Sequence, residues 1–175
     1  MITSSPSLTL PADYPLPGDR NRYRMTLDAI VAGTANDPQI IQTLDPPRPS
    51  DWSPGALRVV TTLKDDHTWT TGIIFGGYVA CLLDLYGGLV MLTVLPDRAR
   101  FLTTHLDVSF LRPTVPGRTR IDATVLEVSA EQAVTEVLLT QRGRVTARGL
   151  ATQAITVQDT PTKKKPTAHR LPAQH

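Results

Sequence analysis

The stretch from Thr71 to Leu95, TGIIFGGYVACLLDLYGGLVMLTVL, most constrains how this chain can fold. After a Gly-Gly pair at 76–77 the stretch is apolar over most of its length and carries one charge, Asp84. A helix that is apolar on all sides must be buried, either in a protein core or in a membrane. At about 1.5 Å per residue, a helix from residue 75 to residue 92 would be about 27 Å long, enough to form the axis of a small domain.

This apolar stretch also approaches the length of a membrane span, which requires about 18 apolar residues. Asp84 near its middle argues against a span, because a carboxylate at the bilayer centre costs about 2.5–3.5 kcal/mol on insertion scales. No Lys or Arg cluster flanks either end to set an orientation. We therefore predict a core helix and no contact with a membrane.

The length of 175 residues suits one domain with a single core. The formal net charge of +2 is modest, and part of the basic excess lies near the C-terminus, which does not favour a nucleic-acid surface. The single cysteine, Cys81, lies on the apolar helix, where a small hydrophobic residue is a better interpretation than a nucleophile. One cysteine excludes an internal disulfide, and the N-terminal residues lack the pattern of a signal peptide. We therefore expect a cytoplasmic protein.

Changes in composition divide the chain into three parts. Residues 1–20 are expected to form a mobile N-terminal arm, residues 21–158 one domain that begins with a helical segment, and residues 159–175 a disordered polar tail. Within the helical segment, apolar residues at helical spacing predict a helix from Asn21 to Gly33 and a short helix from Gln39 to Leu44.

Alternating apolar residues predict strands on both sides of the central helix. Four prolines between residues 45 and 55 predict a loop, after which residues 56–64 read as a strand with Leu57, Val59 and Leu63 on one face. Four more strands are expected at 101–113, 119–129, 133–141 and 145–157, the first of them with Leu102, Leu106, Val108 and Phe110 on one face. The short turns between these strands predict antiparallel hairpins, because parallel neighbours need crossovers of about a dozen residues or more.

These elements define an α+β class. A sheet of about five strands can enclose a helix that is apolar all round only if the sheet curves strongly. Such a sheet leaves open edges, so we expect pairing with a second copy of the chain, as a homodimer or a homotetramer.

Asp84 and the Gly-Gly pair are the first candidates for chemistry. A carboxylate in an apolar helix is costly unless it is paired or faces a polar cleft, so a structural and a functional role for Asp84 both stay open. Gly76 and Gly77 lie where the helix should begin, and there free backbone N–H groups can receive a developing negative charge. Close packing of the helix start against a strand would also explain the two glycines.

The spacing of His67, Gly72, Gly76-Gly77 and Asp84 resembles a motif of one enzyme family. The phenylacetate-type (PaaI-like) branch of the hotdog-fold acyl-CoA thioesterases has the motif H-x-N-x-x-G-x-x-H-G-G-x(6)-D, and the later segment THLDVSFLRPTVPG resembles that family's strand ending in F-x-R-P-x-x-x-G. The resemblance runs from about residue 56 to residue 157. It implies a hotdog fold, in which a curved antiparallel sheet wraps around one long helix.

The resemblance also implies catalytic roles. Asp84 falls on the family's catalytic carboxylate, which acts as a general base on water or as a nucleophile on the thioester carbonyl. The backbone N–H groups of Gly76 and Gly77 would hold the thioester oxygen, and Thr103 falls where a hydroxyl helps to place water in some members. In the family the site forms between two subunits, so Asp84 and Gly76 would serve one pocket from different chains.

Five residues are expected to contact the substrate, namely His67, Trp69, Phe75, Thr104 and Arg112. Arg112 lies where family members often meet the coenzyme A nucleotide. Trp69 and Phe75 depart from the family, which has Asn and His at these positions. Trp69 offers one N–H donor and no acceptor, and Phe75 removes a polar partner. These departures imply an activity that is reduced, retuned to another acyl group, or absent.

The histidines do not predict a metal site, because no Cys, Asp or Glu accompanies them at ligand spacing. We interpret His67 as ordering its loop and His105 as facing solvent or an interface. We expect no cofactor, with coenzyme A entering only as part of the substrate.

The leading function is hydrolysis of an acyl-CoA thioester. A non-catalytic acyl-CoA-binding protein on the same fold is the alternative, and Trp69 and Phe75 favour it. A hotdog hydratase is disfavoured, because the chain lacks a G-D-x-N-P-like loop. The aromatic residues Trp69, Phe75 and Tyr78 suggest an aromatic or medium-chain acyl group.

Overall fold

The computed structural model describes residues 17–18, 21–69 and 72–157. Its elements, in chain order, are α1 (Arg22–Ala32), α2 (Gln39–Leu44), β1 (Asp51–Ser53), β2 (Ala56–Leu63), a 3-10 turn (Asp65–His67), α3 (Gly76–Met91), β3 (Ala99–Phe110), β4 (Gly117–Val128), β5 (Gln132–Gln141) and β6 (Arg144–Val157). The expected tail at 159–175, and the expected arm at 1–20 apart from residues 17–18, lie outside the described residues.

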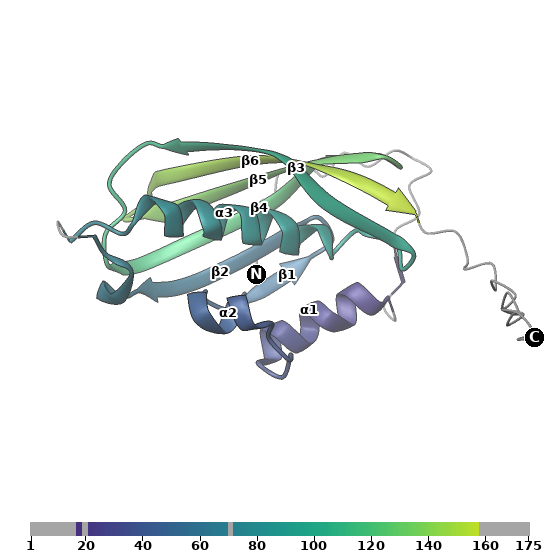
Figure 1. The fold of residues 1–175 in the computed structure, drawn as a ribbon, viewed down its shortest axis with the longest axis horizontal. Coiled ribbons are helices and arrows are strands. Elements are labelled where there is room, and N and C mark those ends of the chain that lie inside the picture. The colour runs from purple at the N-terminus through teal and green to yellow at the C-terminus, as the bar shows by residue number, and fades with distance from the viewer. Residues whose placement is uncertain (1–16, 19–20, 70–71, 158–175) are drawn as a thin grey trace, which may run out of the picture.

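The strands form one antiparallel sheet in the order β1-β2-β4-β5-β6-β3. Helix α3 crosses the concave face of this sheet and contacts every strand from β2 to β6 (Figure 1). Strand β3 follows α3 in the chain but pairs with β6, so the twelve-residue β3 is one edge of the sheet and the short β1 is the other. This arrangement is the hotdog fold that the sequence predicts.

Helix α3 begins and ends within one residue of the bounds expected from the sequence. Leu82, Leu83, Tyr86 and Val90 are fully buried against the sheet. Gly77 and Asp84, in contrast, are exposed. The sheet therefore leaves open one strip of α3, which differs from the expected helix buried on every side. Within the described ranges, no helix is both long and apolar enough to cross a membrane.

The structure corrects the predicted strands at two places. Residues 51–53, expected in a loop, form β1 and pair with β2, which makes six strands where about five were expected. Leu102 lies on the opposite face from Leu106 and is 71% exposed, so the prediction that they share a face is wrong. The reason is a β-bulge, because the pairing of β3 with β6 skips Thr104 and the bulge reverses the alternation of side chains.

Helix α1 is fastened to the end of α3. Asn21 caps α1 with its side-chain oxygen, and its amide nitrogen donates to the carbonyl of Leu95 at 3.0 Å. The guanidinium of Arg24 donates to the carbonyl of Thr93 at 3.1 Å. Figure 1 shows α1 and α2 beside β1 and β2, below α3 in that view. These contacts fasten α1 to the segment that directly follows α3.

Candidate active site

Asp84 lies on the exposed strip of α3, opposite the edge strand β3. The hydroxyl Oγ1 of Thr103 donates a hydrogen bond to Oδ1 of Asp84 at 3.1 Å. The bulge at Thr104 lets Thr103, before it, and Phe110, after it, both face the helix. The structure therefore brings two of the expected catalytic residues together, a carboxylate and a hydroxyl, at an open surface.

The other two expected catalytic residues form the start of α3. Phe75 occupies the N-cap position, and its side chain makes no capping hydrogen bond. The first N–H groups of a helix have no intrahelical acceptor and carry the positive end of its dipole, so they suit a developing negative charge. A Cβ atom added at Gly77 would overlap the ring of Phe75, whereas one at Gly76 would lie 3.6 Å from Phe110. A side chain at position 77 would therefore require the half-exposed Phe75 ring to move, while Gly76 has ordinary room.

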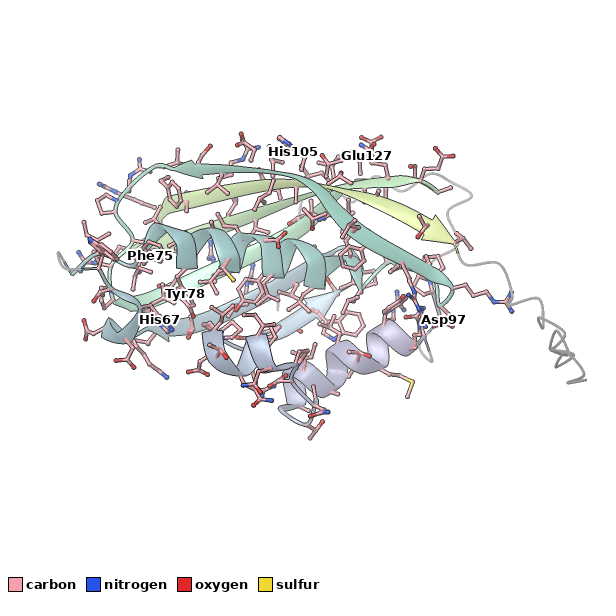
Figure 2. All side chains as sticks on the ribbon, in the orientation of Figure 1. His67, Phe75, Tyr78, Asp97, His105 and Glu127 are labelled. Atoms are coloured by element: carbon pink, nitrogen blue, oxygen red, sulfur yellow. The ribbon has the colours of Figure 1, made fainter. Side chains whose placement is uncertain are left out.

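Four ring side chains gather at the start of α3. Trp69 stacks on Phe75 with ring centroids 5.8 Å apart, and His67 stacks on Tyr78 with centroids 3.9 Å apart. Figure 2 shows His67, Phe75 and Tyr78 at this end of the molecule. The carbonyl of His67 accepts the N–H of Phe75 at 2.8 Å, which joins the loop to the helix start. The Nδ1 atom of His67 is buried without a hydrogen-bond partner.

Arg112 reaches the same end of the fold. A hollow of about 390 Å³ lies between the helix start and residues 110–114, and both Gly76 and Arg112 line it. The guanidinium of Arg112 donates to the carbonyl of Val145 at 2.7 Å and remains exposed to solvent. An exposed cation beside the free N–H groups can attract an anionic part of a ligand.

Thr104 and His105 do not join this group of residues. The hydroxyl of Thr104 donates to the carbonyl of Thr152 in the neighbouring strand at 3.1 Å. His105 is exposed, and Figure 2 shows it on the outer side of β3, away from α3. In the parts of the chain that the structure describes, no three His, Cys, Asp or Glu side chains come together as a metal site.

A larger pocket, of about 590 Å³, lies along another face of α3. Its walls come from α1, α2, the proline-containing segment 45–49, the end of β2 and helix α3. His67 and Tyr78 line one end of this pocket, and Asp84 does not line it. This pocket was not predicted from the sequence, and its only local signal is that the two expected N-terminal helices carry apolar residues such as Ile30 and Ile41.

Burial sets the protonation of three groups near these sites. It raises the pKa of Tyr78 to about 12, with the negative charge of Asp45 as a smaller cause. It also raises the pKa of Tyr86 far above its ordinary value. The pKa of the Cys81 thiol is raised by burial and then by the nearby charge of Asp84. The two phenols therefore stay neutral near physiological pH, and the thiol is not activated as a nucleophile.

The geometry defines a class of protein, a hotdog domain with a carboxylate on its central helix and free N–H groups at the start of that helix. Residues 71–147 match the family model described as Thioesterase superfamily. A protein of Saccharolobus solfataricus, provisionally described as an esterase, is 32% identical over 83 residues. That match covers 47% of this chain and 59% of the relative, so the chain spans less than two thirds of the relative's length.

Solved structures share the fold. A phenylacetic acid degradation-related protein of Ralstonia eutropha, provisionally described as a thioesterase, superposes with a TM-score of 0.65 at 24% identity and covers 74% of this chain and 98% of its own. A protein of Streptococcus mutans bound to acetyl-CoA has a TM-score of 0.57 at 22% identity, with coverages of 64% and 90%. The resemblance to the hotdog-fold thioesterases is therefore confirmed. Helices α1 and α2 lie outside the residues that match the superfamily model.

Proposed function

We propose that this protein hydrolyses acyl-CoA thioesters to a free acid and coenzyme A. The match of residues 71–147 to the Thioesterase superfamily supports thioester hydrolysis in general. The observation that carries the proposal is the hydrogen-bonded pair of Asp84 and Thr103 on the same helix-and-strand unit as the free N–H groups of Gly76 and Gly77.

One chain does not make a complete site. Gly77 and Asp84 are seven residues apart on α3, which corresponds to about 10 Å along the helix axis. A carbonyl held at the N–H of Gly77 is therefore out of reach of Asp84 in the same chain. We propose a dimer in which Asp84 of one copy faces the helix start of the other, with the open edge of β3 at the interface. A two-fold dimer of this kind contains two equivalent sites.

The chemistry follows from these groups. Thr103 gives its hydroxyl hydrogen to Asp84, so its oxygen is free to accept a hydrogen bond from water. Asp84 acts as general base on that water, or as nucleophile on the thioester carbon. In either case the carbonyl oxygen gains negative charge, which the N–H groups of Gly76 and Gly77 stabilise. The carbon–sulfur bond then breaks, and coenzyme A leaves as its thiol, taking up the proton that Asp84 removed from water on the general-base route or a proton from solvent on the nucleophilic route. On the nucleophilic route the acyl group remains on Asp84 as a mixed anhydride, which a water molecule then hydrolyses to the free acid.

Coenzyme A is proposed as the thiol part of the substrate. The structural neighbour from Streptococcus mutans that holds acetyl-CoA supports this choice. Arg112, exposed beside the hollow at the start of α3, is the residue we propose to meet the negatively charged nucleotide. We propose no cofactor beyond the substrate, and the cytoplasmic location stays a prediction.

An acyl-CoA-binding protein without catalysis is the second candidate. The stacked rings of Trp69 and Phe75, exposed by 65% and 51%, stand where the family has polar groups, and they favour binding over hydrolysis. Thiol release from a panel of acyl-CoAs, measured beside calorimetric binding of the same compounds, separates the two candidates. Catalytic thiol release supports the thioesterase, and saturable binding without release supports the binding protein.

A further inference from the structure

The pocket of about 590 Å³ follows helix α3 over most of its length. Tyr78, Leu85, Leu89 and Leu92 line it, and their spacing of seven, four and three residues puts them on one face of the helix. Leu92 comes 14 positions after Tyr78, which corresponds to about 21 Å along the helix axis. Its volume is within the range of about 300–1,000 Å³ that is usual for small-molecule sites, and its shape is elongated.

One end of this pocket lies beside the proposed reaction centre. His67 and Tyr78 line that end, and the carbonyl of His67 accepts the N–H of Phe75, the residue before the Gly-Gly pair. A thioester whose oxygen meets the N–H of Gly77 is therefore held next to Tyr78, the following residue, which lines the pocket. Asp84 does not line the pocket, since it lies on a different face of α3.

The outer wall of the pocket comes from the N-terminal part of the chain. Ile30 from α1, Ile41 from α2 and Pro47 form part of this wall, and none of them lies within the residues that match the superfamily model. The hydroxyl of Tyr86 donates to the carbonyl of Pro47, which ties the wall to α3. These residues cover one face of the central helix, so that face becomes one wall of a largely apolar channel.

We infer that this channel holds the acyl tail of the substrate and that the substrate is a long, unbranched or aryl-ended acyl thioester. This inference rests on the proposed function, because it takes the thioester to be at the start of α3. A long apolar tail matches the length of the channel and its leucine, isoleucine and proline walls. The tail leaves water as it enters, and each buried methylene adds to the binding energy.

Two neighbouring isoleucines of α2 offer a matched test. Ile41 lines the channel, whereas Ile40 is 60% exposed and does not line it. For the wild type, Ile41→Trp and Ile40→Trp, we would measure kcat/KM with hexadecanoyl-CoA and with butanoyl-CoA. The quantity compared is the ratio of the first value to the second. We expect Ile41→Trp to lower this ratio by about tenfold or more, because a few methylenes no longer leave water. Ile40→Trp should keep the wild-type ratio.

An equal ratio in all three proteins would overturn the inference. If no acyl-CoA is turned over, the proposed hydrolysis fails, and the channel is then tested with dodecanoate by calorimetry. Binding that is weaker for Ile41→Trp than for Ile40→Trp still supports the channel, and equal or absent binding overturns it. Thermal unfolding of each variant verifies that the tryptophan has not unfolded the chain.

Discussion

Thr103 donates a hydrogen bond of 3.1 Å to Asp84, and this contact joins the edge strand β3 to the central helix α3. The contact depends on the bulge at Thr104, which turns Thr103 toward the helix while Leu106 and Phe110 also face it. A regular strand with the same residues would place Thr103 and Phe110 on opposite faces. The bulge therefore determines both the partner of Asp84 and the ring beside Gly76.

Replacing Thr103 tests its proposed role in placing water. Thr103→Val keeps the shape and removes the hydroxyl, so we expect kcat to fall by about ten- to a hundredfold with a smaller change in KM. Thr103→Ser keeps the hydroxyl and should retain most of the activity. Steady-state thiol release provides both constants, and a fully active Thr103→Val would contradict the proposed role.

Gly77 and Phe75 are predicted to be coupled. Gly77→Ala introduces a Cβ atom that overlaps the Phe75 ring, so we expect the free energy of unfolding to fall by about 1 kcal/mol. In a Phe75→Ala background the overlap is absent, and Gly77→Ala should raise the free energy of unfolding by up to about 1 kcal/mol, because alanine favours a helix more than glycine does. Urea unfolding of the four proteins measures this coupling. Equal effects of Gly77→Ala in both backgrounds would show that the ring does not restrict this position.

A site shared between two copies predicts complementation. Asp84→Asn removes the carboxylate, and Gly77→Leu blocks the N–H groups, so each variant alone should be inactive. A dimer that contains one copy of each has one intact site, so refolding an equal mixture should restore about a quarter of the wild-type activity. Native mass spectrometry confirms that mixed dimers have formed. Mixed dimers without activity would argue against the shared site.

Tyr78 predicts a loss of stability in alkali. Its pKa is raised from 10.0 to about 12 in the folded chain, so the folded state holds this proton more tightly than the unfolded state does. The resulting stability is fully present below about pH 10 and is lost as the pH rises toward 12. Tyr78→Phe should therefore lose less stability than the wild type between about pH 9 and about pH 11. Identical pH slopes in urea unfolding would refute this assignment.

Cys81 predicts a slow reaction with iodoacetamide. Burial and the charge of Asp84 raise the pKa of its thiol, so little reactive thiolate is present at neutral pH. Asp84→Asn removes the smaller of the two causes, and the alkylation rate should rise while staying below that of the urea-unfolded chain. A rate that does not change in Asp84→Asn would mean that the charge does not reach the thiol.

The helices could be predicted because their signals are local. Asn21 and Gly33 mark the ends of α1, and the apolar run after Gly76 marks α3. The hotdog fold around α3 was implied by the resemblance of the motif with Gly76, Gly77 and Asp84 to a known family. Strand β1 could not be predicted, because Asp51–Ser53 is too short to alternate and is held by pairing with β2. The bulge at Thr104 likewise depends on the pairing of β3 with β6, and no glycine in this part of β3 indicates it in the sequence.

The apolar channel depends on tertiary packing, which explains why the sequence did not reveal it. Ile30 and Ile41 become its wall only when α1 docks through Asn21 and Arg24 onto the end of α3. Within the proposed site, Asp84, Gly76 and Gly77 could be predicted from their spacing in the sequence. Once both residues are assigned to one helix, Gly77 and Asp84 are about 10 Å apart along its axis. This distance is the reason that we propose a site completed by a second copy of the chain.

The most direct test of the account is thiol release from a panel of acyl-CoAs by the wild type and by Asp84→Asn. The substitution keeps the size of the side chain and can still accept a hydrogen bond from Thr103, so the fold should survive, as circular dichroism and thermal unfolding will show. We predict turnover by the wild type and a loss of about a hundredfold or more in kcat for Asp84→Asn. A folded Asp84→Asn protein that releases thiol at the wild-type rate would contradict the account.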